Sequence, residues 1–329
     1  MPCTIENAWG WYDSQPSLCG FNYVCGSAAS AINMWEGGYF DLPAIQRELA
    51  WAGDIGFNCC RTFLPYLVWQ ADAEGLVDRV DRFLAACDER GIRTVFVLLD
   101  DSGSSQPQLG RVEPQTPGRM GLWAPSVPPE VMVNRQGWGG IKAYITDLLW
   151  QFGQDQRVLA WDLYNRPGDN GLGEQTQLLL AEVFEWARIA QPLQPLTVGL
   201  WTDQFPSIEE TIRLGCDVLS FHHHGDAQSL RQRIAQLKAA DRPVLCTDWL
   251  ARPDSAVRTH LPIFQQERIG CFLWQLVNGP TQTHLAPQGQ ARPEPPAWYQ
   301  DLLGHDGQPY DSAEIELLRD ELEKNKAPG

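Results

Sequence analysis

Ten side chains that could do chemistry follow the strand-like runs of this sequence, each at the point where its run ends. They are Asn22, Arg61, Asp100, Asn165, Arg166, Trp201, His222, His224, Asp248 and Trp274. Asp248 is a carboxylate that can serve as a nucleophile or a base, and Arg166 is a permanent cation whose guanidinium suits a carboxylate or a sulfate. We predict that these ten residues converge on one site.

These residues can act together only if the fold brings the strand ends to one place. The strand-like runs centre near residues 20, 60, 95, 160, 197, 220, 246 and 273. Between them, apolar residues recur at helical spacing over 42–56, 73–91, 140–153, 176–190 and 226–241. Strict alternation of buried strands and helices predicts an α/β fold, a single (β/α)8 TIM barrel over residues 1–329. In such a barrel the carboxyl ends of all strands meet at one mouth.

Two long connections interrupt this regular alternation. Residues 101–137, rich in Pro, Gly and Ser, follow the third strand, and residues 278–296 follow the eighth. Loops of this length are usually functional or disordered, and both should cover the mouth of the barrel. Neither glycine-rich phosphate-binding fingerprint follows a strand, which disfavours an open, doubly wound sheet.

The charge of the chain excludes some classes of partner. The formal net charge is −16 over 329 residues, and the isoelectric point is about 4.7. Such a chain repels nucleic acid and anionic membrane surfaces, whereas a neutral sugar is indifferent to the field. The 14 tryptophans fit a carbohydrate cleft, where sugar rings stack on aromatic faces, although most of them are expected in the core.

The nine cysteines show no zinc-ligand spacing and are an odd number. We therefore expect buried free thiols in a reducing compartment, no metal and no cofactor. The amino-terminal segment has no basic and apolar leader pattern, and no apolar run is long enough to span a membrane. These observations predict a cytoplasmic protein of undetermined oligomeric state.

Several segments together resemble glycoside hydrolase clan A, in particular its cellulase-like and β-xylanase-like members. The run VLAWDLYNRP is similar to the strand-four signature of that clan, which ends in Asn-Glu-Pro, and PVLCTDWLARP is similar to its strand-seven signature, which contains Thr-Glu. SFHHHGD resembles the strand-six His-x-Tyr region, FLWQLVNGPTQT the strand-eight Trp segment, and FNCCRTFLPYLVW the strand-two Arg region. The resemblance covers nearly the whole chain, including the closing segment PPAWYQDLLGHDGQPYDSAEIELLR.

The resemblance implies retaining hydrolysis of β-linked sugars by two glutamates, and this sequence departs from it at both positions. Arg166 stands where the acid/base glutamate is expected, and Asp248 where the nucleophile is expected. The resemblance therefore implies that these two residues are the catalytic pair, and we predict that the other eight residues at the strand ends bind the substrate. An arginine cannot give up a proton usefully, and aspartate is one methylene shorter than glutamate. Loss of a general acid typically costs about 10²–10⁴-fold in rate. Ordinary retaining hydrolysis is therefore not expected, although Asn165, Arg61, His222 and Trp274 match supporting positions of the clan.

Three hypotheses follow. The first is an atypical glycosidase in which another carboxyl serves as the acid and Arg166 binds an anionic group. The second is a non-catalytic sugar-binding protein in which Arg166 and Asp248 form an ion pair. The third is a metal site made of His222, His224 and Asp248. The candidate acids for the first hypothesis are Glu36, Asp100, Asp101, Asp169 and Glu174.

Overall fold

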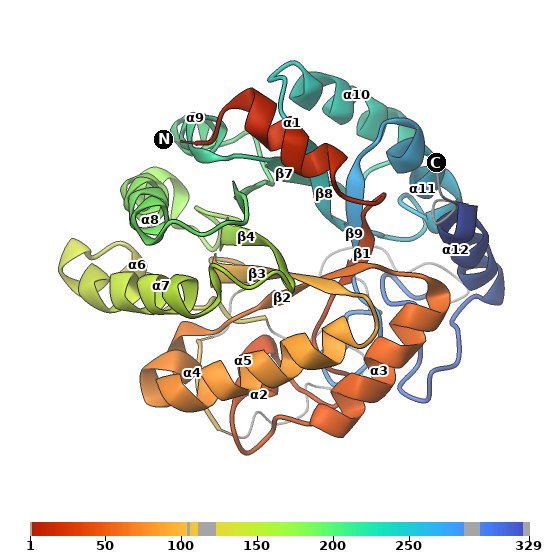
Figure 1. The fold of residues 1–329 in the computed structure, drawn as a ribbon, viewed down its shortest axis with the longest axis horizontal. Coiled ribbons are helices and arrows are strands. Elements are labelled where there is room, and N and C mark those ends of the chain that lie inside the picture. The colour runs from red at the N-terminus through yellow and green to blue at the C-terminus, as the bar shows by residue number, and fades with distance from the viewer. Residues whose placement is uncertain (1, 104–105, 111–122, 286–296, 325–329) are drawn as a thin grey trace.

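The computed structural model of the chain describes residues 2–103, 106–110, 123–285 and 297–324. Its parallel strands form one sheet with helices on the outside, as Figure 1 shows. The strands are β1 (Cys19–Asn22), β2 (Cys59–Phe63), β3 (Arg93–Asp100), β4 (Val158–Asn165), β5 (Leu196–Thr197), β6 (Gly199–Leu200), β7 (Leu219–His222), β8 (Val244–Trp249) and β9 (Gly270–Leu273).

The order of the strands closes the sheet into a barrel. It runs β5-β4-β3-β2-β1-β9-β8-β7-β6, and β5 and β6 are separated in the chain by one residue, Val198. These two short strands are therefore the two halves of the fifth barrel strand. The predicted (β/α)8 barrel is confirmed, with each of the eight predicted strands in its place.

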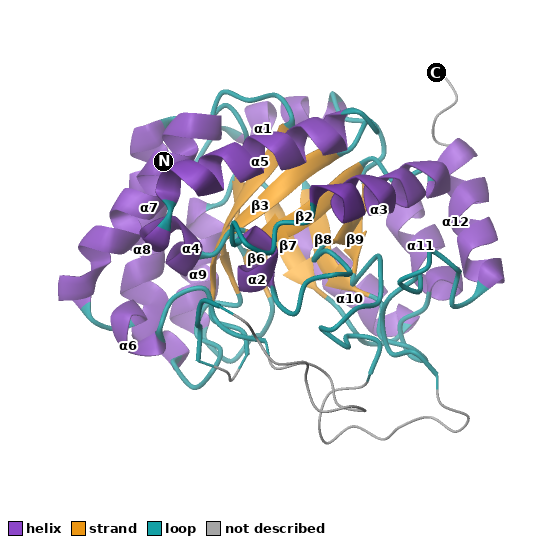
Figure 2. Cartoon of the chain, turned by 90° about the horizontal axis from the view of Figure 1, so that it is seen from below, coloured by secondary structure: helices purple, strands orange, loops and turns teal. Residues whose placement is uncertain are grey.

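Helices surround this sheet, and Figure 2 shows the strands enclosed by them. The main outer helices are α3 (Leu42–Ile55), α5 (Ala73–Asp88), α7 (Trp138–Phe152), α8 (Gln177–Ala190), α9 (Pro206–Gly215), α10 (Ala227–Lys238), α11 (Val257–Gln266) and α12 (Ser312–Lys324). Shorter helical segments are α2 (Ala31–Trp35), α4 (Tyr66–Ala71), α6 (Pro129–Met132), η1 (Arg135–Gly137) and η2 (Gly173–Thr176). Helices α9, α11 and α12 were not predicted from apolar spacing.

Local sequence accounts for where several helices begin and end. The side chain of Asp41 accepts a hydrogen bond from the Ala44 backbone and caps α3, and Asp226 caps α10 through Ser229 in the same way. Helix α3 ends at Gly56, whose φ of 106° is in the left-handed region that favours glycine.

An additional helix, α1 (Ile5–Asp13), lies across the amino-terminal end of the barrel. The Tyr12 hydroxyl donates to the Arg268 carbonyl at 2.8 Å, and the Trp9 indole donates to the Asp241 carbonyl at 3.1 Å. Tyr12 packs with a small apolar cluster that includes Val95 and Val218. This helix closes the end of the barrel opposite the strand carboxyl ends, which leaves the predicted mouth as the place for a site.

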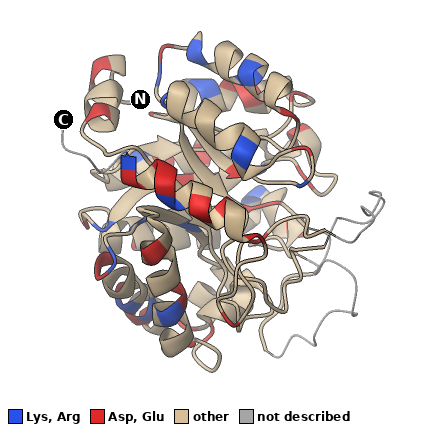
Figure 3. Ribbon diagram, turned by 90° about the vertical axis from the view of Figure 1, so that its right-hand side faces the viewer, with Lys and Arg blue, Asp and Glu red and all other residues tan. Residues whose placement is uncertain are grey.

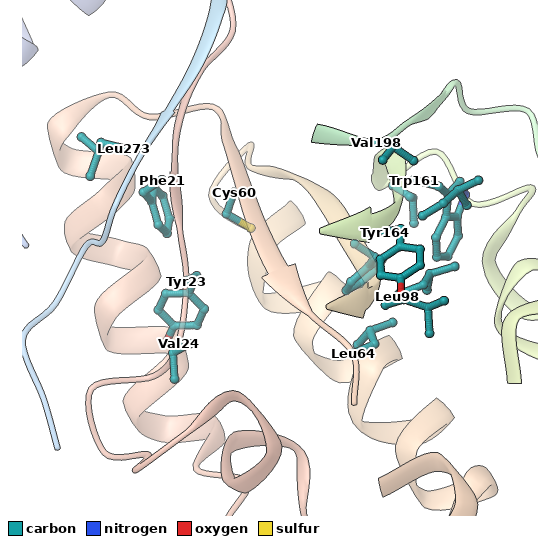
Figure 4. Close-up of a cluster of buried hydrophobic side chains, with 14 of the residues drawn as sticks. Phe21, Tyr23, Val24, Cys60, Leu64, Leu98, Trp161, Tyr164, Val198 and Leu273 are labelled. Carbon is teal, nitrogen blue, oxygen red and sulfur yellow. The ribbon is translucent and has the colours of Figure 1, made fainter. Parts of the chain in front are cut away.

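Apolar side chains fill the space between the strands and the outer helices. Figure 4 shows part of this core, where Phe21, Tyr23, Trp161 and Tyr164 are packed with aliphatic residues. Each of the nine cysteines, all within the described ranges, carries a free thiol, and eight of them are buried. The expectation of buried free thiols is met everywhere except at Cys3, which is partly exposed.

Acidic residues lie on the outer helices and account for the net negative charge. Figure 3 shows them among the helices of one side of the molecule, and α12 alone carries Glu314, Glu316, Asp320, Glu321 and Glu323. None of the helices in the described ranges combines the length and the apolar character that crossing a membrane requires.

Candidate functional site

The barrel places nine of the ten predicted site residues at or just beyond the carboxyl ends of its strands, and the tenth, Arg61, lies in the middle of β2. Five of the nine are the last or last but one residue of a strand: Asn22, Asp100, Asn165, His222 and Asp248. The other four follow a strand directly or within two residues: Arg166, Trp201, His224 and Trp274. The ten residues differ in exposure. Asn22 and Arg61 have no exposed surface, whereas the Arg166 side chain is 35% exposed and the His224 side chain 34%.

Below the mouth, a buried network is centred on Arg61. Its Nε and Nη2 atoms lie 3.0 and 2.7 Å from one carboxylate oxygen of Asp162, and its Nη1 donates to Asn22 at 2.8 Å. Nη2 also donates to the side-chain oxygen of Asn165 at 2.8 Å. Asp162, a β4 residue that the sequence did not single out, thus neutralises the buried arginine. Asp162 could have been identified from the sequence, because it is a charged residue inside a largely apolar strand.

Asn165 links this network to Asp100. Its amide nitrogen donates to Asp100 Oδ1 at 2.7 Å, and the other oxygen of Asp100 accepts from the Trp123 indole at 2.5 Å. Both the backbone and the hydroxyl of Ser102 also bond Oδ1. Burial raises the pKa of Asp100, although these hydrogen bonds to Ser102, Trp123 and Asn165 oppose the rise. Asp100 therefore holds the loop after β3 in place.

Three aromatic rings form one wall of the mouth. The rings of Phe63, Trp123 and Trp274 lie edge to face, with centroids 5.1, 5.3 and 5.8 Å apart. Trp123 and Trp274 remain partly exposed. Beside them, a small hollow is lined by Phe63, Trp123 and Asp100 together with Ile32 and Pro65. Trp123 was missed in the sequence because it lies in an irregular loop with no periodic pattern.

Arg166 lies in the turn that follows β4. Its Cζ is 4.7 Å from the centre of the Trp201 ring, and its Nε is 2.9 Å from Asp169 Oδ2, where it forms an ion pair without the alignment of a hydrogen bond. Trp201 in turn donates to the Pro167 carbonyl at 3.0 Å. The hypothesised ion pair between Arg166 and Asp248 is therefore wrong, because Asp169, three residues on, is the nearer partner.

The turn holds Arg166 in an unusual backbone conformation. Its φ is 50°, in the left-handed region that costs a residue with a side chain free energy. Gly168, with φ of 85°, donates its backbone N–H to Asp101 Oδ2 at 2.9 Å, and the Tyr164 hydroxyl donates to the same oxygen at 2.9 Å. Burial raises the pKa of Asp101 well above its ordinary value, and these two hydrogen bonds oppose the rise. Asp101 thus anchors the turn rather than facing the mouth.

Asp248 pairs with two histidines from the neighbouring strand. His224 Nε2 lies 3.0 Å from Asp248 Oδ1, and His222 Nδ1 lies 3.8 Å from Oδ2. The strand register shifts between Phe221 and His222, so that His222 stands opposite Asp248 while Thr247 has no partner in the ladder. Such an irregularity redirects side chains, and here it brings both histidines to one carboxylate.

Burial and neighbouring charges shift the pKa values of Asp248, His222 and His224 in different directions. Burial alone would raise the pKa of Asp248, but the charge and hydrogen bond of His224, together with the charge of Arg61, outweigh it and hold the pKa below its ordinary range. Burial lowers the pKa of His222 to about 3, so this ring is neutral. For His224, burial acts against the charged form, yet the charge and hydrogen bond of Asp248 outweigh it and raise the pKa.

The proposed metal set does not form. Across the described ranges, no three His, Cys, Asp or Glu side chains are placed to hold a metal ion. The His224 nitrogen that would face a metal is instead bonded to Asp248. The candidate acids are also engaged elsewhere: Glu36 accepts from the Gly110 backbone at 2.7 Å, and Glu174 accepts from the Ser207 backbone at 3.2 Å.

No model of a known protein family matches the sequence, and no curated protein matches it either. Solved structures do match in fold. A GH5_18 protein from Streptomyces cattleya in complex with Manβ1-4GlcNAc superposes with a TM-score of 0.67 at 15% identity, over 96% of this chain and 82% of that chain. The chain shares the (β/α)8 barrel fold of this structure.

Two further structures share this glycosidase fold. An exo-β-1,4-mannosidase from Opitutaceae bacterium strain TAV5 matches with a TM-score of 0.65 at 16% identity, over 95% of this chain and 60% of that chain. An endo-β-1,4-mannanase from Thermotoga petrophila matches with a TM-score of 0.64 at 13% identity, over 96% and 78%. At such identities the likeness concerns the fold, so the function has to be argued from the site.

Proposed function

We propose that this barrel binds a β-linked carbohydrate carrying an anionic group, and that it does not hydrolyse glycosides by the two-glutamate retaining mechanism. The observation that carries the proposal is the position of Arg166. Its guanidinium stands at the end of β4 with one face on Trp201 and 35% of the side chain exposed. A guanidinium presented in this way can bind a carboxylate or a sulfate through two parallel hydrogen bonds.

The aromatic wall supports the carbohydrate part of the proposal. Trp123 and Trp274 offer partly exposed rings at the mouth, and sugar rings stack on such faces. One neighbour in fold is bound to Manβ1-4GlcNAc, a β-linked disaccharide. A ligand placed between the aromatic wall and Arg166 would have its ring on the tryptophans and its charge on the guanidinium.

The retaining mechanism lacks its acid at this site. It needs two carboxyl groups roughly 5–5.5 Å apart, one of which gives a proton to the leaving oxygen. Arg166 cannot give that proton, and Asp169 beside it is paired with Arg166. Asp100 and Asp101 are at most 2% exposed and bonded to their own loops. The remaining carboxylate, Asp248, is held as an anion by its histidines.

The free cysteines support placing the protein in a reducing compartment, and we propose the cytoplasm. Nine thiols that remain unpaired are typical of that environment.

Turnover and binding can be tested on the same protein. The wild-type chain, Asp248→Ala and Arg166→Glu are incubated with aryl β-glucosides, β-mannosides and β-glucuronides, and the melting temperature is measured with each sugar. We expect no release of the aryl group by the wild type and a higher melting temperature with glucuronides than with glucosides, because a ligand that binds the folded state stabilises it.

Two outcomes would change this view. Release of the aryl group by the wild type that Asp248→Ala abolishes would make the protein a glycosidase and overturn the proposal. Equal melting temperatures with and without every sugar would remove the binding role. A gain of activity in Arg166→Glu alone would show that a retaining site lost its acid at this position, which agrees with the proposal.

A further inference from the structure

One part of the mouth has no role in binding an anionic sugar: the pair formed by Asp248 and His224. The His224 Nε2–H donates to Asp248 Oδ1 at 3.0 Å, so the other ring nitrogen, Nδ1, is the one that can accept a proton. The His224 side chain is 34% exposed, whereas the Asp248 side chain is 12% exposed. The pair therefore presents an imidazole to the mouth and keeps the carboxylate behind it.

This arrangement makes His224 a stronger base than an ordinary histidine. The charge and hydrogen bond of Asp248 favour its protonated form and outweigh the effect of burial, so the pKa of His224 is raised. The other ionisable groups that act on the pair are His222, which stays neutral, and Arg166 and Arg61, whose positive charges act on it from β4 and β2. A histidine oriented and made more basic by a carboxylate is a common general base for proton removal.

Arg166 and His224 both follow the carboxyl ends of their strands, β4 and β7, so they lie at the same end of the barrel, and the charge of Arg166 disfavours protonation of His222 and His224. Its Nε is turned to Asp169 and its guanidinium lies over the Trp201 ring, and within the described ranges its two terminal nitrogens make no hydrogen bond. The mouth thus combines one base with one cation that can hold a carboxylate. This combination suits removal of a proton from the carbon next to that carboxylate, since negative charge then develops on the carboxylate oxygens.

We propose that His224, supported by Asp248, removes the proton at C5 of a uronic acid unit whose carboxylate is bound by Arg166, and that the unit then loses its substituent at C4 by β-elimination. This inference rests on the proposed binding of an anionic sugar. The C5–H bond breaks, its proton goes to His224 Nδ1, and its electron pair passes into the carboxylate. The pair then forms the C4–C5 double bond while the C4–O bond breaks. The proton on His224 passes to the departing oxygen, so no water, oxidant or metal is consumed.

The contact between Asp248 and His224 favours this chemistry over inverting hydrolysis. Inversion needs an acid and a base about 6.5–9.5 Å apart on opposite faces of the sugar. Asp248 and His224 share one proton and act from one face, so they count as a single base. Elimination in which the proton and the leaving group depart on the same side needs only one such group.

The test follows two signals on 4-linked uronic acid oligosaccharides and on neutral oligosaccharides of the same linkage. Exchange of the C5 hydrogen in deuterated water is measured by NMR, and the new double bond is measured by ultraviolet absorbance. Aryl monosaccharide uronides have only a hydroxyl at C4, so they bind without undergoing this elimination and serve as a binding control. The variants are His224→Gln and Asp248→Asn, with His223→Gln as the matched control, because His223 faces the Asp226 carbonyl at 3.2 Å.

We expect wild type and His223→Gln to exchange C5 hydrogen and form the double bond with uronic acid oligosaccharides only. His224→Gln should lose about 10²–10⁴-fold in rate with its affinity for the aryl uronide unchanged. In Asp248→Asn the pH at which the rate is half-maximal should fall, because the charge that raises the pKa of His224 is gone.

Tight binding without exchange or elimination in the wild type would overturn this inference and leave the binding proposal intact. Absence of binding would overturn both. Elimination at an undiminished rate in His224→Gln would also reject the assignment of the base, and saturated reducing ends in place of the double bond would show hydrolysis instead.

Discussion

His224 Nε2 lies 3.0 Å from Asp248 Oδ1, at the junction of β7 and β8. Because the Asp248 charge stabilises the imidazolium, Asp248→Asn should lower the pKa of His224. NMR titration of the ring protons measures this directly, and His260, whose Nε2 lies 3.0 Å from the Gly225 carbonyl, should keep its pKa in the same spectra. An unchanged His224 titration would mean that the pair does not form in solution.

The buried pair of Arg61 and Asp162 should be costly to break. Arg61→Leu leaves Asp162 as an uncompensated charge beneath the mouth, which we expect to lower the free energy of unfolding by about 3–5 kcal/mol. Denaturant unfolding gives the value. Arg268→Ala removes an exposed ion pair with Asp13, whose side chains are 70% and 55% exposed, and should change the free energy by about 1 kcal/mol or less. Similar losses in the two variants would contradict the role given to the network.

Trp123 should contribute to sugar affinity both by its ring and by its hold on Asp100. Trp123→Ala removes a face of the aromatic wall, so we expect weaker binding by about 1 kcal/mol or more, and Trp123→Phe should lose less because it keeps a ring. Calorimetry with one ligand compares the two. Trp150→Ala, on the outer face of α7 at 68% exposure, is the control and should bind like wild type. Full affinity in Trp123→Ala would place the ligand elsewhere.

Asp301 should make the stability of the fold depend on pH. It is fully buried, and burial raises its pKa from 3.8 to about 7, against the hydrogen bond from Thr283. The folded state therefore holds a proton that the unfolded state releases above about pH 4. Its contribution is complete below pH 4 and is lost as the pH rises to about 7.

Asp301→Asn, which carries no ionisable proton, should remove this loss. Urea unfolding at pH 5 and at pH 8 measures this. We expect the free energy of unfolding of wild type to fall, relative to that of Asp301→Asn, between the two pH values. The same difference at both pH values would show that Asp301 is not protonated in the fold.

The sequence predicted the barrel because buried strands leave continuous apolar runs, and each run ended in a residue that the closed sheet brings to one mouth. It could not predict the partner of Arg166. That choice depends on the left-handed backbone of the turn after β4, which directs the guanidinium to Trp201 and Asp169.

Two other features of the site could not be predicted from the sequence either. The position of Trp123 depends on an irregular loop, and the contact between His224 and Asp248 depends on a register shift between β7 and β8. Neither feature leaves a periodic pattern in the residues, whereas the buried Asp162 of β4 could have been found.

The most direct measurement of the central claim is the affinity of wild type and Arg166→Gln for a β-glucuronide and for the matching β-glucoside. We expect wild type to prefer the glucuronide and Arg166→Gln to lose this preference, by about tenfold or more, while its affinity for the glucoside is unchanged. Arg135→Gln, a variant of an exposed arginine that is 69% accessible, should behave like wild type. An undiminished preference for the glucuronide in Arg166→Gln would contradict the account.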